Sequence, residues 1–232
     1  MTNFNDYFKS AVTVDNVIFG FDDGDLKILL IKRGEAPHEG VWALPGHFVR
    51  EEEDLVSAAN RVLDELTGLK NVYLEQVKTF GRVDRHSFGR VITVAYYSLV
   101  KISDYKINVQ STVAKKAKWH SISSEKNLAF DHNEILEACF SQLKSSVRIR
   151  PIGFELLPPK FTLTQLQHLY EAILDLENGL DKRNFRKKIL SMNLLVDLNE
   201  MQEGVAHRPA KLYKFDKEKY EQFVSDGYNF EL

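Results

Sequence analysis

Hydrophobic and polar positions follow a strand pattern in two segments near the start of the chain. Residues 11–21 (AVTVDNVIFGF) and 26–33 (LKILLIKR) are rich in β-branched and aromatic residues, and a polar DDGD turn separates them. Two such runs around a short turn predict a β-hairpin. The same composition predicts further strands at 72–83, 89–101 and 113–120.

A helical period appears between these strands, over residues 53–66. The predicted apolar face comprises Leu55, Ala59, Val62 and Leu66. Gly68 suits a cap position after the last turn, and a second helix is predicted at about 132–144. Strands on both sides of a central helix indicate an α/β or α+β domain, with a mixed sheet sandwiched by helices.

The pattern changes after a proline-containing stretch, PIGFELLPPKF, that begins at Pro151. The elements predicted beyond it are helices at 164–174 and 182–192 and strands at 194–199 and 211–215. Asp181 is the expected N-cap of the second of these helices. The order helix, helix, hairpin is that of a winged helix-turn-helix. The chain therefore divides into predicted domains at 1–150 and 151–232.

Composition narrows the class of protein. The chain has 232 residues, and its 44% hydrophobic and 28% charged residues are ordinary for a globular protein. The single cysteine, Cys139, excludes an internal disulfide and fits a reducing compartment. No signal peptide or membrane span is recognisable, so we expect a cytoplasmic protein without a membrane partner. The net charge of −2 means that nucleic-acid binding would need a local basic patch.

The segment GVWALPGHFVREEEDLVSAANRVLDELTGL, residues 40–69, resembles a Nudix box. Gly46 and the residues before it resemble the entry of that motif, and Glu53 lies at the right distance from Gly68. The positions that match its second half are Arg61, Leu63, Glu65, Gly68 and Leu69. The resemblance covers roughly residues 10–145 and implies a Nudix fold.

Nudix hydrolases hold divalent cations with carboxylates four residues apart on one helical face. In this chain those two positions are Val62 and Leu66, which offer no oxygen ligand. We therefore expect no catalytic residue, no metal site and no cofactor. The alternative is an active Nudix hydrolase that cleaves ADP-ribose or another nucleoside diphosphate derivative.

A fold without hydrolytic activity still leaves a pocket in which cationic side chains can bind a phosphate or a sugar. The candidate ligand-binding residues are Arg33, Arg61, Glu65 and Arg82. The FDH segment at Phe130–His132 opens the last helix of this domain. We expect Asp131 to be its N-cap and Phe130 a hydrophobic staple, with a catalytic Asp-His pair as the alternative.

Residues 182–188 (KRNFRKK) hold five basic residues in seven. Facing DNA, such a helix neutralises phosphates and sends a few side chains to base edges. The candidate contacts are Lys182, Arg183, Asn184, Arg186 and Lys187, joined by His207, Arg208 and Lys211 from the turn that would form the wing. A plain interaction module that binds an acidic protein is the alternative.

Several segments together resemble the NrtR family of Nudix-related transcriptional regulators. They are GVWALPG, RVLDELTGL, LAFDH, FTLTQLQHLYEAIL, DKRNFRKK and RPAKLY. The resemblance implies a homodimer that represses operons from a palindromic double-stranded DNA operator. One branch of the family senses ADP-ribose, and a related branch senses a pentose such as L-arabinose. The residues do not separate these two effectors.

Overall fold

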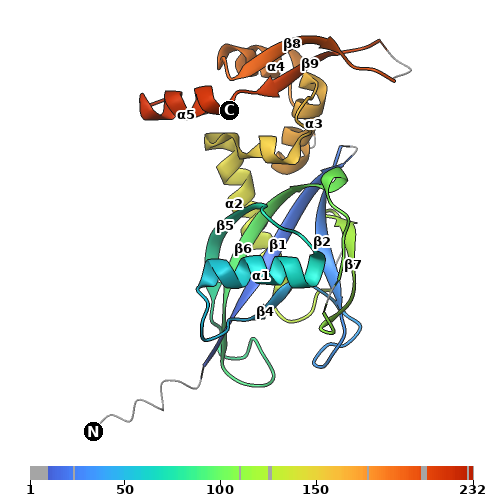
Figure 1. Cartoon of the computed structure of the whole chain (residues 1–232), viewed down its shortest axis with the longest axis vertical. Coiled ribbons are helices and arrows are strands. Elements are labelled where there is room, and N and C mark those ends of the chain that lie inside the picture. The colour runs from blue at the N-terminus through green and yellow to red at the C-terminus, as the bar shows by residue number, and fades with distance from the viewer. Residues whose placement is uncertain are drawn as a thin grey trace. The chain divides into compact units, whose positions relative to one another are not determined.

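The computed structural model describes residues 10–22, 24–109, 111–124, 127–176, 178–204, 208–228 and 230–231. The chain forms two compact units. The first comprises Met1–Gly20 and Lys27–Gln142, and the second comprises Phe21–Leu26 and Leu143–Leu232. Figure 1 labels the elements of both units.

Within the described residues, a seven-stranded sheet forms the centre of the first unit. Its strands are β1 (Ala11–Asp22), β2 (Asp25–Arg33), β3 (Trp42–Ala43), β4 (Gly46–Phe48), β5 (Tyr73–Phe80), β6 (Val91–Lys101) and β7 (Ala114–Ser121). The main order is β3-β2-β1-β6-β5, with β4 paired to β1 and β7 paired to β2. The five predicted strands are confirmed, whereas the short strands β3 and β4 were not predicted.

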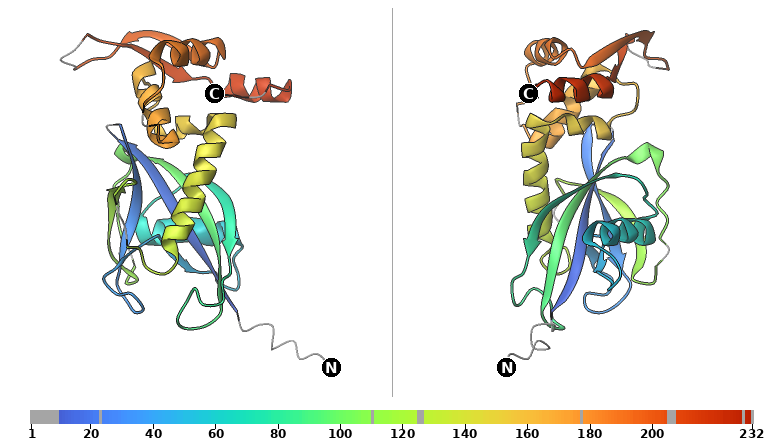
Figure 2. Two further views of the ribbon diagram at one scale, coloured as in Figure 1. Left: turned by 180° about the vertical axis from the view of Figure 1, so that it is seen from behind. Right: turned by 60° about the vertical axis from the view of Figure 1, so that its left-hand side comes forward.

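Helix α1 (Leu55–Thr67) lies on one face of this sheet, and residues 132–142, the part of α2 (His132–Ile149) that belongs to this unit, lie on the other (Figures 1 and 2). Asn16 of β1 donates a hydrogen bond to the carbonyl of Ala59 in α1. On the opposite face, the ring of Phe19 contacts that of Phe140 in α2, with centroids 6.1 Å apart. The sheet sandwiched by helices is therefore confirmed.

The ends of α1 follow from its capping residues. The Asp54 side chain accepts a hydrogen bond from the Ser57 amide, so the helix begins two residues later than predicted. Gly68 adopts a φ of 78° and donates its amide to the Asp64 carbonyl, which confirms the predicted cap. Val62 and Leu66 are 0% and 1% exposed and lie in one apolar cluster with residues of β1, β2 and β6.

The second unit contains a short 3-10 helix (Pro151–Leu156), α3 (Leu163–Leu174), α4 (Lys182–Ser191), β8 (Leu195–Met201), β9 (Lys211–Phe215) and α5 (Lys217–Ser225). Tyr170 of α3 and Phe185 of α4 are both buried, with ring centroids 5.9 Å apart. Strands β8 and β9 pair antiparallel. This is the predicted winged helix-turn-helix.

Local signals account for the helix starts in this unit. Thr162 and Gln165 form a reciprocal capping box at the start of α3. Asp181 accepts from the Asn184 amide, which confirms it as the N-cap of α4. Helix α5 was not predicted, and none of its residues is buried. Across the described residues, no helix is both long and apolar enough to cross a membrane.

We expect Leu66→Ala to reduce the free energy of unfolding by roughly 2–5 kcal/mol, because it leaves a cavity in the core beneath α1. The matched control is Val56→Ala on the exposed side of the same helix, where Val56 is 54% exposed. That change should stay within about 0.5 kcal/mol. Urea denaturation followed by circular dichroism measures both values. Equal losses in the two variants would show that the Leu66 position is not a core position.

Candidate functional site

A cavity of about 310 Å³ opens in the first unit. Its walls come from β1, β2, β4 and the loop after β2. The loop before β6 and the start of α2 complete it. Because these segments are distant in sequence, the fold itself assembles the cavity. We call it the Nudix-unit pocket.

Two buried charged residues, Arg85 and Asp15, line this pocket, and we call them and the side chains that hold them its floor. Arg85 binds Asp131 with two hydrogen bonds, from Nε at 2.9 Å and from Nη2 at 2.7 Å. The same Nη2 lies 3.6 Å from Asp15 Oδ2, which also accepts a hydrogen bond from the Thr93 hydroxyl at 2.7 Å. Arg85, Asp131 and Asp15 are 6%, 6% and 5% exposed. As predicted, Asp131 occupies the N-cap position of α2, where its carbonyl accepts the Ile135 amide at 3.2 Å, but its side chain binds Arg85.

His132 is held next to these charges in one tautomer. Its Nδ1 accepts a hydrogen bond from the Leu44 amide at 2.9 Å, so the remaining proton lies on Nε2. Nε2 faces Asp15 Oδ1 at 3.6 Å. Burial lowers the pKa of His132, which keeps the ring neutral. His132 and Asp131 are thus engaged with different partners, and they do not form the hydrogen-bonded pair of the catalytic alternative.

Aromatic rings and Arg33 form one wall of the pocket. The ring of Phe130 stacks on His86, with centroids 5.0 Å apart and an interplanar angle of 13°. The guanidinium carbon of Arg33 lies 4.9 Å from the Phe130 centroid. Arg33 Nε donates to the Pro37 carbonyl at 2.8 Å, and burial lowers the pKa of this arginine. Phe130 therefore lines the pocket, and the staple role expected for it stays a prediction.

The other three predicted ligand residues lie outside the pocket lining. Arg61 and Glu65 lie on α1, where Arg61 donates two hydrogen bonds to Glu53 at 2.8 and 2.5 Å and one to Glu65 at 3.1 Å. The Arg61 hydrogen bonds lower the pKa of Glu53 to about 2. Arg82 is exposed and pairs with Asp84 and Glu134. Of the four candidates, only Arg33 contributes to the pocket.

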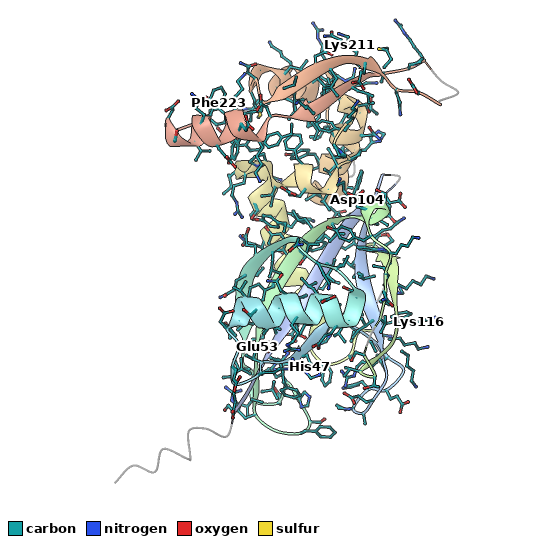
Figure 3. The ribbon with its side chains drawn as sticks, in the orientation of Figure 1. His47, Glu53, Asp104, Lys116, Lys211 and Phe223 are labelled. Carbon is teal, nitrogen blue, oxygen red and sulfur yellow. The ribbon has the colours of Figure 1, made fainter. Side chains whose placement is uncertain are left out.

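The residues around α1 do not fit a divalent cation. Val62 and Leu66 are buried in the core, and Glu53 and Glu65 are neutralised by arginines, including Arg50 at 3.0 Å from Glu65. Figure 3 shows Glu53 beside the first turn of this helix. Among the described residues, no group of three or more His, Cys, Asp or Glu side chains is placed to hold a metal ion.

The DNA contacts predicted in the second unit differ in exposure. Four of those on α4 have exposed side chains: Lys182, Arg183, Asn184 and Lys187. Arg186, on the same helix, is partly buried and donates to the Thr164 hydroxyl at 3.0 Å. In the predicted wing, Arg208 is exposed, Lys211 at the start of β9 (Figure 3) pairs with Asp197 at 2.8 Å, and His207 lies outside the described residues.

Most of the pocket floor was not predicted from the sequence. Asp15 carries a weak signal, because it is a charged residue inside an otherwise apolar strand. The sequence around Arg85 and Thr93 gives no such signal, because arginine is common in polar loops and threonine is common in strands. Phe130 and His132 were recognised as candidates, but their contacts were not predicted.

Comparison with known protein families finds two matches along the chain. Residues 9–139 match the NUDIX domain. Residues 153–215 match the NrtR DNA-binding winged helix domain. Each match falls within one of the two predicted domains.

Two of the relatives that follow cover both units, and a third covers the Nudix unit. The ADPR responsive transcriptional repressor NtrR of Acinetobacter baylyi is 37% identical over 94% of this chain and 86% of its own length. The crystal structure of Shewanella oneidensis NrtR complexed with a 27mer DNA is 29% identical, with a TM-score of 0.75 over 94% of this chain and 97% of that one. The NUDIX domain of the same protein complexed with ADP ribose is 32% identical, with a TM-score of 0.56 over 61% and 94%.

We expect the buried His132 to make stability depend on pH. Its pKa in the folded protein is lowered from the usual value of about 6.5 that it regains on unfolding. Its contribution is therefore present above about pH 6.5 and is lost as the pH falls toward the folded pKa, by up to about 1.4 kcal/mol per pH unit.

The variant His132→Asn tests this, because an asparagine carbonyl oxygen can accept the Leu44 amide in place of Nδ1. Its free energy of unfolding, from urea titrations between about pH 7.5 and 5.5, should fall less steeply than that of the wild type. Burial also lowers the pKa of His86, so some slope should remain in the variant. Parallel wild-type and variant curves would contradict the assignment.

Proposed function

The chain belongs to the NrtR family of transcriptional regulators, and we propose that it is a DNA-binding repressor controlled by a small molecule bound in its Nudix unit. The observation that carries the proposal is the similarity of both units together to a repressor of that kind. A Nudix unit alone would suggest a hydrolase. The winged helix unit, with its basic α4, supports a role on DNA.

Helix α4 is the proposed recognition element for the major groove. Its Phe185 and Ile189 are buried against the rest of the unit, which leaves the basic side outward. We propose that Lys182, Arg183, Asn184 and Lys187 reach base edges and nearby phosphates, with Arg208 acting from the wing. In the major groove, an asparagine side chain can form two hydrogen bonds with the edge of adenine, and an arginine side chain can form two with the edge of guanine.

We propose that the protein acts as a homodimer in the cytoplasm. Two copies of α4 would then read two half-sites about one helical turn apart, so the operator should be an inverted repeat. The similar NrtR structure from Shewanella oneidensis contains a 27mer DNA, which is long enough for two half-sites at this spacing.

The proposed effector site is the Nudix-unit pocket. ADP-ribose is the first candidate, because the relative from Acinetobacter baylyi is an ADPR responsive repressor and the similar NUDIX domain was solved with ADP ribose. The stacked Phe130 and His86 rings offer a flat apolar surface for a base. Arg33 lines the same pocket, and we propose that it meets a phosphate of the ligand.

A neutral pentose is the second candidate, and the charges of the pocket favour it. Asp15 and Glu35 offset Arg33 and Arg85 in the lining, and Asp131 already neutralises Arg85. A diphosphate would therefore meet no net positive charge. At about 310 Å³ the cavity also lies near the small end of the usual range of roughly 300–1,000 Å³ for ligand pockets.

Binding without hydrolysis is the remaining part of the proposal. The face of α1 that would present cation ligands is core, and the neighbouring glutamates bind arginines. Effector binding then changes only the equilibrium between arrangements of the protein, by the difference in its affinity for them.

We expect the full-length protein to select, from a random duplex library, an inverted repeat with half-sites about 10 base pairs apart.

Titrating ADP-ribose, L-arabinose or other pentoses into the complex of protein and selected duplex should change the DNA affinity with one of the two ligand classes, ADP-ribose or pentose. Phe130→Ala should raise the effector concentration required by roughly tenfold, since it removes the stacking surface. Val83→Ala, at an exposed position outside the pocket lining, is the control. Absence of any selected duplex would refute the repressor, and a response to neither ligand class would refute the effector assignment.

We expect no hydrolysis of ADP-ribose in the presence of Mg²⁺. AMP release by the wild type should equal that of Glu65→Gln, in which the only acidic residue retained from the end of the Nudix box is neutralised. Chromatography of the nucleotides measures the release. AMP production clearly above that of the variant would establish the alternative, an active Nudix hydrolase.

A further inference from the structure

A second cavity, of about 220 Å³, lies in the DNA-binding unit where α3, α4 and the start of β9 meet. We call it the wing-root cavity. It is lined by Leu163, Thr164, Arg186, Ala210, Lys211 and Tyr213. This lining contains two cationic side chains and two hydroxyl groups, and it contains no carboxylate. The chemistry is that of an anion site.

Arg186 is the fixed cation of this cavity. Its Nη2 donates to the Thr164 hydroxyl on α3 at 3.0 Å. Its Nε is buried and has no hydrogen-bond partner, and no other partner of its guanidinium is found among the described residues. A partly buried guanidinium with unused donors is unfavourable unless an acceptor reaches it. The guanidinium of Arg186 therefore has donors available for an anion from outside the described part of the chain.

Lys211 and the start of α3 add to the positive potential. Lys211 Nζ lies 2.8 Å from Asp197, an exposed pair in which the ammonium group keeps two further donors. The capping box uses the amides of Thr162 and Gln165. The amides of Leu163 and Thr164 belong to the first turn of α3, where no intrahelical acceptor exists and the helix dipole is positive.

We propose that the wing-root cavity binds one phosphate of the DNA backbone, with Arg186, Lys211 and the first turn of α3 as its donors. The inference rests on the proposed DNA-binding function and assigns a role within it. The hydrogen bond to Thr164 of α3 holds the guanidinium of Arg186 at the cavity, and we therefore assign this residue to a phosphate. It belongs to the contacts that position the protein, whereas its exposed neighbours on α4 can read sequence.

A phosphate held at this place would fix the register of α4. The cavity joins the first helix, the recognition helix and the wing, so a single anion there contacts all three elements. Such a contact is independent of base sequence. It should therefore strengthen binding to every duplex equally and contribute to the salt dependence of binding.

The test is a salt titration of DNA affinity with the full-length protein. Fluorescence anisotropy on a duplex selected from the random library and on a duplex of unrelated sequence, at about 50 to 400 mM KCl, gives the slope of log affinity against log salt. For Arg186→Gln we expect weaker binding to both duplexes by the same factor, with the slope reduced by about 1. The fall in affinity between about 50 and 200 mM salt should then be about 3.5-fold smaller than for the wild type.

Three further variants distinguish a phosphate contact of Arg186 from a base contact and from a purely structural role. Asn184→Ala should weaken binding to the selected duplex alone and leave the slope unchanged. Asp197→Asn, which frees Lys211, should strengthen binding to both duplexes. Thr164→Val removes the hydroxyl that holds Arg186 and keeps every charge, so it should weaken both duplexes less than Arg186→Gln does. Circular dichroism melting checks that each variant folds.

Two results would overturn the inference while leaving the DNA-binding function in place. One is a wild-type slope in folded Arg186→Gln. The other is a loss confined to the selected duplex, which would make Arg186 a base contact. If the wild type bound neither duplex at any salt concentration, the proposed function and this inference would fail together.

Discussion

The burial of one face of α1 is the constraint on which the first unit depends. Val62 and Leu66 fill the space between this helix and the sheet, and a carboxylate at either position would lie in the core without water. Cation ligands therefore cannot occupy this face without breaking the packing that holds the helix in place. Next to this face, Arg61 and Arg50 form ion pairs with Glu53 and Glu65. These arginines neutralise carboxylates that would otherwise have no positively charged partner.

The pocket floor satisfies a different constraint, the cost of burying charge. Arg85 and Asp131 form a bidentate pair, Thr93 donates to Asp15, and His132 stays neutral with one nitrogen on the Leu44 amide. Removing one partner of such a pair leaves the other charge buried and unpaired, which is far more costly than the pair itself is stabilising. The network therefore gives a rigid floor with fixed donors and acceptors.

Elements that depend on local sequence were predictable, and contacts between distant segments were not. The period of α1, its Gly68 cap and the Asp181 cap of α4 follow from residues within one or two turns of each other. The pocket instead joins Asp15, Arg85 and Asp131, which are separated by up to 116 positions. Asp15 lies on β1, Arg85 in the loop between β5 and β6, and Asp131 directly before α2, so these side chains meet only in the folded unit. The two-residue strand β3 is too short for any periodicity, and α5 lacks an apolar face that is buried within the unit.

The basic helix shows why composition alone cannot assign roles. Residues 182–188 form one charged run in the sequence, yet the fold separates them by what surrounds each side chain. Phe185 is core, Arg186 is bound to Thr164, and Arg183 is exposed. In the proposed function, effector and DNA would each change the affinity of the chain for the other by the same factor, since coupling is a free energy shared by two sites. Helix α2 begins with His132 in the pocket floor and ends at Ile149 in the second unit, so it is a covalent element common to both. An effector that contacts His132 differently in two arrangements of the chain would act on an element that the DNA-binding unit contains, which is the physical requirement for such coupling.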